Sequence, residues 1–449
     1  MLRIIDLRKL LLYFLLLALI VGGVVWALLQ FERNAPTVNI KLHSDYISSK
    51  PFRVEIHDKG KGLKKVSISL LTAGREYPII AEQFDTSIRK KDITVTVSRN
   101  ELDIRDGPAV LRVVAVDRSY WGFFKGNKTL IRKDVKVDLT PPKIQLLSGD
   151  RFVNFGGSGL VLYRSSSDAK ASGVKIGQYF FRGYKGLLPD PNTYMVFFAH
   201  PYDVTADEKA ALFVEDNAGN SGQAELPYSL RNIKFNKSTV NVTDSYIKKK
   251  VAPLLGEGLS LQGNLKELFT KVNSDLRQEN EAKIRKVCEE SAKEMLWSEP
   301  FHQLSNSKVE AKFADERTYV YKGETVDHAY HLGYDLAVTR NYPVEAANSG
   351  VAVFADDLGI YGNTVIIDHG LGLFTLYSHM SSITVTEGDR IKRKQIIGKT
   401  GETGLASGDH LHYATLIHGV PVLPLEWWDG RWVRENILSK VPKKTTDRL

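Results

Sequence analysis

Four histidines and one aspartate fall in three short motifs in the last third of the 449-residue chain. The first motif, HisLeuGlyTyrAsp, places His331 and Asp335 four residues apart; TyrSerHis ends at His379, and HisLeuHis contains His410 and His412. Side chains an even number of residues apart can lie on one face of an extended strand. The spacing therefore allows nitrogen and carboxylate ligands to converge.

Such a set of side chains suits a catalytic metal site. Zinc in catalytic sites takes three protein ligands from His, Asp or Glu and keeps a fourth position for water. The metal lowers the pKa of that water and polarises a carbonyl group, so water becomes a usable nucleophile near neutral pH. Two further imidazoles could move protons or stabilise negative charge. The motifs therefore predict metal-assisted hydrolysis with one Zn²⁺ per chain.

The same motifs, in this order and among strand-like segments, resemble the lysostaphin-like or LytM-like family of zinc endopeptidases. The segments HLGYDLA, GNTVIIDHG and TGETGLASGDHLHY carry the resemblance, which covers about residues 300 to 432. It implies that His331, Asp335 and His412 bind zinc and that His379 and His410 are the catalytic pair. The substrate class that it implies is the peptide cross-links of peptidoglycan in the bacterial cell wall.

Two alternatives of a different class stay open beside the enzyme. A catalytically silent relative could activate other cell-wall hydrolases, or an envelope adaptor could use the peptidase fold as a scaffold. Intact residues at all five central positions favour the enzyme. A biotinyl or lipoyl carrier domain, suggested by VTEGDRIKRKQIIGKTG, is disfavoured because no lysine is displayed in a tight turn. Both a peptidoglycan and a protein substrate are compatible with the motifs.

Other reactive residues are expected to serve the fold. His328 and His418 lie outside the register of the motifs and are predicted at the surface or beside the ligands. His369 precedes a Gly turn and is expected to support a strand end. Cys288, the single cysteine, excludes an intramolecular disulfide and is predicted to be an inert, partly buried thiol.

The site residues need a rigid frame, which short strands separated by Gly and Asp turns would supply. Residues 300–435 are therefore predicted to form a compact all-β domain, followed by a basic tail at 436–449. Residues 244–299 are predicted to form an amphipathic helical connector, broken at Gly256 and Gly258 and closed by Pro300. This connector could pack on the β domain or cover its active site.

Two related modules are expected upstream, at residues 35–140 and 141–243. Each opens with Pro and a strand-like run and closes with an apolar strand entering an acidic turn, LRVVAVDRSYWG and AALFVEDNAGN. Short alternating strands favour immunoglobulin-like β-sandwiches, which would serve as spacers or as arms that bind envelope proteins. The fold class is thus mainly β.

The segment from Leu10 to Leu29 carries no charge and is long enough for the roughly 30 Å core of a bilayer. It predicts a single transmembrane helix, with a cleavable signal peptide as the competing interpretation. Basic residues before the helix place residues 1–9 in the cytoplasm. The protein is therefore expected in the inner (cytoplasmic) membrane, with its catalytic domain in the periplasm or extracytoplasmic space.

The net charge of +9 favours anionic surroundings such as lipid head groups or wall polymers. No recognition helix, RNA-binding signature or zinc finger accompanies this charge, so nucleic acid is not an expected partner. The expected partners are peptidoglycan and the membrane.

Overall fold

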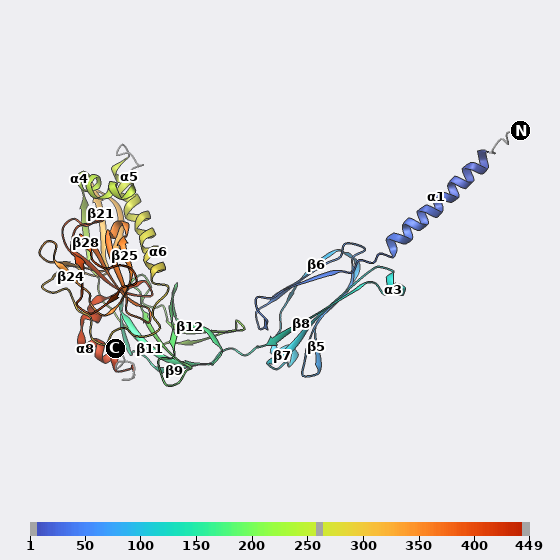
Figure 1. Cartoon of the computed structure of the whole chain (residues 1–449), viewed down its shortest axis with the longest axis horizontal. Coiled ribbons are helices and arrows are strands. Elements are labelled where there is room, and N and C mark those ends of the chain that lie inside the picture. Colours follow the sequence, from blue (N-terminus) through green and yellow to red (C-terminus); the bar gives the residue numbers. More distant parts are fainter. Residues whose placement is uncertain (1–6, 257–263, 442–449) are drawn as a thin grey trace. The chain divides into compact units, whose positions relative to one another are not determined.

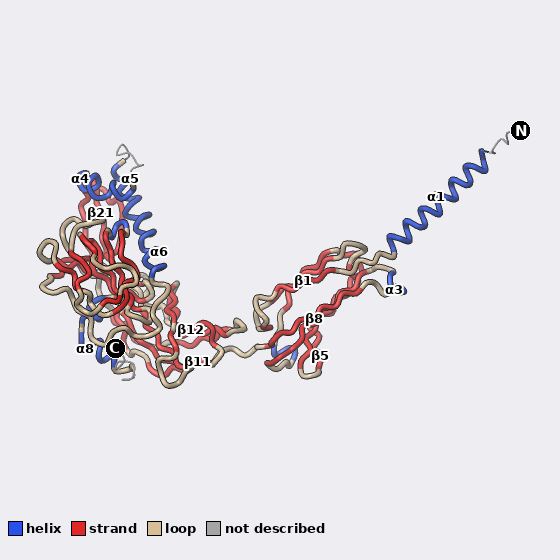
Figure 2. The backbone as a smooth tube through the Cα atoms, viewed as in Figure 1, coloured by secondary structure: helices blue, strands red, loops and turns tan. Residues whose placement is uncertain are grey.

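The computed structural model describes residues 7–256 and 264–441, and its fold is mainly β, as predicted (Figures 1 and 2). The chain divides into two compact units: Met1–Pro141 with Asp216–Ser221, and Pro142–Glu215 with Gly222–Leu449. The predicted break at Gly258, most of the cytoplasmic segment and the end of the basic tail lie outside the described residues.

The first unit begins with the apolar helix α1 (Leu7–Gln30). Its 24 residues span about 36 Å at 1.5 Å per residue, which exceeds the bilayer core. Most of its Leu, Val and Phe side chains are exposed, so the protein itself does not bury them. The helix is thus long and apolar enough to cross a membrane, and a signal sequence would pass the same test.

Two sheets of the first unit share one core, the arrangement of a β-sandwich. One sheet has the order β1–β3–β6 and contains β1 (Thr37–Lys41), β3 (Phe52–His57) and β6 (Lys90–Val95). The other has the order β2–β8–β7–β4–β5 and contains β2 (Tyr46–Ile47), β8 (Lys128–Val137), β7 (Gly107–Asp117), β4 (Leu63–Thr72) and β5 (Arg75–Ile88). Short helices α2 (Arg99–Leu102) and α3 (Trp121–Phe124) interrupt the strands. Alternate residues of β3 and β7 are buried, because successive side chains of a strand point to opposite faces.

The second β module also contains two sheets, each with four strands. The first has the order β14–β15–β11–β9, with β14 (Tyr184–Lys185), β15 (Thr193–Ala199), β11 (Ser158–Ser165) and β9 (Ile144–Ser148). The second has the order β13–β12–β16–β17, with β13 (Tyr179–Arg182), β12 (Ala169–Ile176), β16 (Ala211–Asp216) and β17 (Ser221–Glu225). A parallel pair, β10 (Phe152–Asn154) with β18 (Ser229–Arg231), completes it.

The acidic turns that suggested an internal repeat have matching hydrogen bonds. The Asp117 carboxylate accepts bonds from the backbone N–H and the side-chain amide of Asn127, at 2.7 and 2.8 Å. The Asp216 carboxylate accepts the same two kinds of bond from Asn220, at 2.8 and 3.0 Å. Both aspartates are buried. Both modules thus contain the same kind of Asp–Asn contact after an apolar strand, and their immunoglobulin-like topology stays a prediction.

The predicted connector is helical, but it ends earlier than expected. It follows β19 (Lys237–Val242) and contains α4 (Asp244–Tyr246), η1 (Ile247–Val251), η2 (Ala252–Leu255), α5 (Leu265–Thr270), η3 (Lys271–Leu276) and α6 (Arg277–Val287). The prediction that Pro300 closes the helix was wrong. Beyond α6 the backbone bonds to the β domain instead: Ala292 donates to Asp368 Oδ2 at 2.7 Å and Leu296 donates to the His369 carbonyl at 2.9 Å.

The C-terminal β domain is built on an eight-stranded sheet. Its order is β20–β23–β31–β27–β26–β25–β29, with β32 paired to β31. The strands are β20 (Lys308–Ala311), β23 (Tyr334–Ala337), β31 (Leu411–Ile417), β27 (Leu373–Met380), β26 (Asn363–Asp368), β25 (Gly350–Asp357), β29 (Arg390–Ile391) and β32 (Val420–Val422). The short helix η4 (Gly359–Tyr361) lies between β25 and β26 in the sequence.

Two three-stranded sheets accompany the large sheet. One has the order β19–β21–β22, with β21 (Asp315–Tyr321) and β22 (Glu324–His331); the other has the order β24–β30–β28, with β24 (Pro343–Glu345), β30 (Ile396–Lys399) and β28 (Ser382–Ile383). Short helices α7 (Pro424–Trp428), α8 (Gly430–Trp432) and η5 (Val433–Leu438) follow.

Aromatic packing joins the second β module to the C-terminal β domain within the second unit. Trp427 is fully buried, and its ring lies 5.7 Å from Phe197, 5.9 Å from Trp297 and 5.5 Å from Phe301. Such edge-to-face pairs add about 0.5–1.5 kcal/mol each beyond the area that they bury. The two parts therefore share one hydrophobic core.

We expect the stability of this junction to depend on pH through Glu426. Its buried carboxylate accepts bonds from the Ser158 N–H and hydroxyl and from the Asn154 amide. Burial outweighs these bonds and raises the pKa of Glu426 from 4.5 to about 7. The folded state thus binds this proton more tightly than the unfolded chain does. The stabilisation is full below about pH 4.5 and is lost as the pH rises to about 7, by about 3 kcal/mol.

Urea unfolding at pH 5 and pH 8, followed by tryptophan fluorescence, tests this expectation. The difference in unfolding free energy between wild type and Glu426→Gln should fall by about 3 kcal/mol from the lower to the higher pH, because glutamine cannot ionise. Glu435→Gln, at an exposed ion pair with Arg431, should show no such change. A pH-independent difference for Glu426→Gln would contradict the prediction.

Candidate functional site

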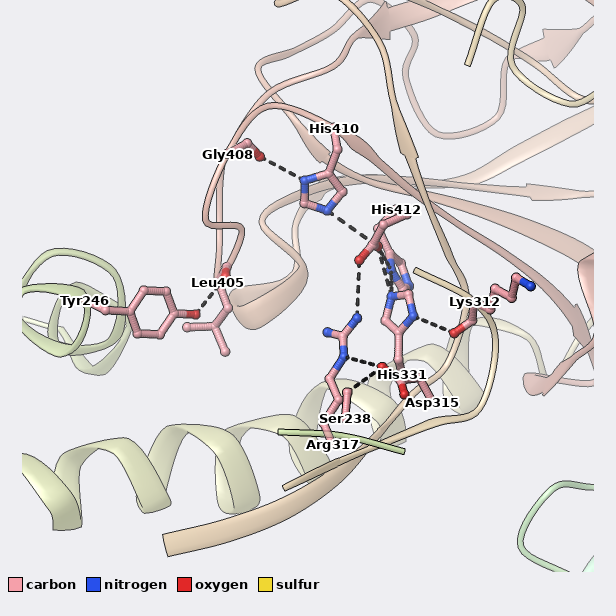
Figure 3. A network of polar contacts seen from close by, with 11 residues as sticks. Ser238, Tyr246, Lys312, Asp315, Arg317, His331, Leu405, Gly408, His410 and His412 are labelled. Carbon is pink, nitrogen blue, oxygen red and sulfur yellow. Dashed lines mark hydrogen bonds and ion pairs between the residues drawn. The ribbon is translucent and has the colours of Figure 1, made fainter. Parts of the chain in front are cut away.

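The five side chains of the sequence motifs line one cavity of about 510 Å³. Figure 3 shows this region from close by. His331 ends β22, Asp335 lies in β23, His379 in β27 and His412 in β31, while His410 immediately precedes β31. Residues 81 positions apart in the sequence thus become neighbours.

Three donor atoms of this group form a small triangle. His331 Nε2 lies 2.9 Å from Asp335 Oδ1 and 2.9 Å from His412 Nδ1, and His412 Nδ1 lies 3.0 Å from Asp335 Oδ1. One ion could reach all three atoms at about 2.0–2.2 Å, the distances of zinc to nitrogen and oxygen ligands.

The hydrogen bond on the other side of the His331 ring sets its tautomer. His331 Nδ1 lies 2.9 Å from the Lys312 carbonyl, which can only accept, so Nδ1 carries the proton. In the neutral ring, Nε2 is then a lone pair that faces the carboxylate oxygen of Asp335. Two such acceptors at 2.9 Å repel one another unless a cation lies between them. The donor set therefore fits a bound metal ion.

His379 and His410 are held in the same way. His379 Nδ1 donates to the Thr403 carbonyl at 2.9 Å, and His410 Nδ1 donates to the Gly408 carbonyl at 2.8 Å. Their rings are 5.0 Å apart, and the remaining nitrogen of His410 lies 3.5 Å from Asp335 Oδ1. The two imidazoles thus lie beside the candidate metal ligands, and the hydrogen bond and charge of Asp335 outweigh burial and raise the pKa of His410.

Strand pairing positions the aspartate opposite the last histidine. β23 and β31 are antiparallel, and Asp335 pairs directly with His412. His331 reaches them across the bend at Leu332 and Gly333, so the HxxxD motif spans two strands rather than one extended segment. A Cβ atom on Gly333 would lie 2.7 Å from the His412 ring. Glycine is required there because the backbone passes so close to the imidazole.

The prediction that His379 shares a strand face with Tyr377 was wrong. The pairing of β26 with β27 shifts register near the end of β27, and His379 has a φ of 63°. This bulge turns His379 into the cavity. Tyr377 faces the core instead, where its ring packs 5.4 Å from Tyr413 and its oxygen accepts a bond from the Ala347 N–H.

Arg317, which no sequence motif marks, completes the polar network (Figure 3). Its Nη2 lies 3.4 Å from Asp335 Oδ2, and its Nε lies 3.3 Å from Asp315 Oδ2. Ser238 Oγ donates to the same oxygen of Asp315 at 2.8 Å. Asp315 lies two residues from Arg317 on β21, whereas the contact with Asp335 on β23 arises only in the fold.

The connector borders the cavity. Tyr246, Phe269, Asn273 and Arg277 contribute to its lining. Tyr246 also donates its hydroxyl to the Leu405 carbonyl at 2.8 Å. Packing of the connector on the β domain is thus confirmed, while a gating role stays a prediction.

The local charges shift the pKa values of the site in opposite directions. Burial raises the pKa of Asp335, but His331, His410 and His412 outweigh it and hold this pKa well below its usual range. Burial lowers the pKa of His412 to about 4. Burial, with His410 and His412 nearby, also holds the pKa of His379 well below its ordinary value. The Asp335 carboxylate is therefore ionised and the His412 imidazole is neutral, the protonation states that metal ligands require. The His379 imidazole is neutral as well.

The remaining residues singled out in the sequence lie outside the cavity. His328 is exposed, and His369 is fully buried between the Ser349 carbonyl and the Thr375 hydroxyl, as expected for a structural role. His418 is half-buried and stacks on Tyr184 of the second β module. Cys288 is buried, which raises the pKa of its thiol and keeps it unreactive, as predicted.

Comparison with known proteins now adds to this geometry. Residues 329–424 match the model of Peptidase family M23. The C-terminal β domain belongs to peptidase family M23. The matched segment begins two residues before His331 and includes all five motif residues that line the cavity.

Relatives of the M23 domain include two proteins named as endopeptidases. The chain is 39% identical over 107 residues to the DD-carboxypeptidase/endopeptidase Mpg of Neisseria meningitidis, covering 23% of this chain and 25% of the relative. It is 37% identical over 116 residues to the peptidoglycan DD-endopeptidase ShyA of Vibrio cholerae, covering 26% of each. The chain thus spans about a quarter of the length of these relatives. The solved catalytic domain of lysostaphin from Staphylococcus simulans is 26% identical and covers 27% of this chain and 92% of that domain, with a TM-score of 0.24.

We expect the triangle of donor atoms to determine the metal content. Inductively coupled plasma mass spectrometry of the purified chain should find about one zinc per molecule. The variant His331→Ala should contain almost none, because the two remaining ligands hold zinc too weakly. His328→Ala removes an exposed histidine three residues away and should keep its zinc. Equal zinc contents in the two variants would contradict the assignment of His331 as a ligand.

Arg317 is expected to strengthen the metal site through Asp335. Partners that orient a ligand typically contribute about 10- to 100-fold in metal affinity. Arg317→Gln should therefore weaken zinc binding by about that factor in a competition titration with a chromophoric chelator. Arg340→Gln, which removes an exposed arginine 3.7 Å from Glu402, serves as the control. Unchanged affinity in Arg317→Gln would show that this ion pair does not support the ligand.

Proposed function

We propose that the protein is a zinc metalloendopeptidase that hydrolyses peptide cross-links of peptidoglycan. The observation that carries the proposal is the convergence of His331 Nε2, Asp335 Oδ1 and His412 Nδ1 on one point in a cavity that also contains His379 and His410. The M23 domain supports the reaction class, and the names of Mpg and ShyA support the substrate class.

The five residues have two kinds of role in this proposal. His331, Asp335 and His412 hold one Zn²⁺, whose chemistry is to activate water and polarise a carbonyl. His379 and His410 are fixed by their Nδ1 bonds, so each offers its Nε2 to the cavity. One imidazole can accept a proton from the attacking water, and the other can donate to the developing oxyanion or to the leaving amine.

Helix α1 supports a membrane-anchored protein in this proposal. We propose that it crosses the inner membrane once, with the N-terminus in the cytoplasm and the M23 domain in the periplasm or extracytoplasmic space. Substrate and enzyme would then share one compartment. The first β module would act as a spacer or as an arm that binds envelope proteins.

Digestion of purified sacculi by the full-length chain in detergent micelles tests the function. Mass spectrometry of the released muropeptides should show cross-linked dimers converted to monomers, and it identifies the bond that is cut. Loss of this conversion upon zinc chelation, with recovery upon zinc addition, would support the enzyme. No release in any condition, together with stimulation of a separate wall hydrolase, would favour a catalytically silent activator instead.

His379→Ala and His410→Ala should separate catalysis from metal binding. Each variant is expected to retain its zinc and to convert muropeptides about 10²- to 10⁴-fold more slowly, the usual contribution of a general acid or base. His328→Ala should leave the rate unchanged. Wild-type rates in both variants would remove His379 and His410 from the mechanism, and zinc loss would place them among the ligands.

A further inference from the structure

A second group of acidic side chains lies in the first compact unit. Glu32 follows the end of α1, Asp58 follows β3 and Asp117 ends β7. One carboxylate oxygen from each residue lies within 4.8 Å of those of the other two. Three distant segments of the chain thus bring negative charge to one place.

The buried Asp58 carboxylate is only half satisfied. Its Oδ2 accepts bonds from the backbone N–H groups of Gly60 and Gly62, at 3.0 and 2.6 Å. Asp58 is 0% exposed, and its Oδ1 has no hydrogen-bond partner among the described residues. A buried carboxylate oxygen without a partner is costly, so this atom indicates a missing ligand.

The neighbouring side chains do not supply the missing positive charge. Within the described part of the chain, no lysine, arginine or histidine forms an ion pair with Glu32, Asp58 or Asp117. Asp58 and Asp117 are buried and Glu32 is half-buried, so the surroundings screen the repulsion between the two aspartates poorly. A bound cation would relieve this repulsion and complete the coordination of Asp58 Oδ1.

We propose that Glu32, Asp58 and Asp117 bind a Ca²⁺ ion. The ligands are all carboxylates, which suit a hard cation rather than zinc or copper. Ca²⁺ takes six to eight oxygen ligands at about 2.3–2.6 Å, so three carboxylates can supply only part of its coordination. Backbone carbonyls and water would fill the remaining positions.

The proposed ion would stiffen the segment that follows α1. The Glu32 carbonyl already accepts bonds from the Ser119 hydroxyl at 2.7 Å and from the Asn127 amide at 3.0 Å, and Glu32 Oε1 accepts from the Lys61 N–H at 2.8 Å. Calcium would join this segment to the ends of β3 and β7 through the Asp58 and Asp117 carboxylates. The chain would leave the helix in a fixed direction.

Terbium luminescence of the full-length chain in detergent micelles tests the site. Tb³⁺ replaces Ca²⁺ at oxygen-rich sites, and Tyr120 and Trp121 follow Asp117 by three and four residues, close enough to sensitise it. We expect one saturable Tb³⁺ signal that CaCl₂ displaces and MgCl₂ displaces far less well. The signal should persist in His331→Ala, since the zinc site is separate. Absence of a saturable signal, or its loss in His331→Ala, would overturn the proposal.

Matched variants locate the ligands. Asp58→Asn and Glu32→Gln should each weaken Ca²⁺ binding by at least about tenfold, because they remove a ligand charge. Asp85→Asn removes an exposed carboxylate of the same module and should bind Ca²⁺ as wild type does. In the presence of the chelator EGTA, circular dichroism should show that both ligand variants are folded, since each has lost one of the three mutually repelling carboxylates. Added Ca²⁺ should raise the unfolding temperature of the wild type but not of these variants. Wild-type Ca²⁺ affinity in both variants would overturn the assignment.

Discussion

The lone pair of His331 Nε2 and the ionised oxygen of Asp335, only 2.9 Å apart, impose the central constraint on the M23 domain. In the neutral imidazole neither atom can donate to the other, because the single ring proton is donated to the Lys312 carbonyl. A cation between them converts this repulsion into attraction. The sheet maintains the contact, since the pairing of β23 with β31 places Asp335 beside His412 and the small Gly333 lets the imidazole approach. The fold thus holds a geometry that the side chains alone would not adopt.

The candidate site was predictable to the extent that its chemistry is local in sequence. The three short motifs pointed to His331, Asp335, His379, His410 and His412, and all five line the same cavity. Strand alternation also correctly placed His410 and His412 on one side. Alternation failed at His379, because a bulge reverses the side-chain direction and no residue type in TyrSerHis announces it. Arg317 could not be found either, since its contact with Asp335 depends on how β21 lies beside the site.

The fold was predictable in class and element type but less so in its boundaries. Apolar spacing in the connector correctly indicated helices, and strand-like runs after Pro300 correctly indicated a β domain. The helix stops at Val287 rather than Pro300 because backbone groups of residues 292 and 296 find partners on the β domain, and these partners are distant in sequence. Likewise, nothing in the local pattern around Trp427 indicates that its ring packs against Phe197 of the second β module.

The two acidic centres of the chain illustrate how charge and donor type select different ions. Asp335 is surrounded by imidazoles, so the site has mixed nitrogen and oxygen donors and suits zinc. Asp58 and Asp117 accept hydrogen bonds from backbone N–H groups, and the third member of their group, Glu32, is also a carboxylate. The candidate metal ligands in this group are therefore all oxygen atoms, which suit calcium. Each centre contains a polar atom whose neighbours do not satisfy it. In the first, the Nε2 lone pair of the neutral His331 ring faces a carboxylate oxygen; in the second, Asp58 Oδ1 is buried without a hydrogen-bond partner among the described residues. These unfavourable contacts persist because the sheets around each centre fix the strand ends. A bound cation that suits the ligand atoms of each centre would relieve them.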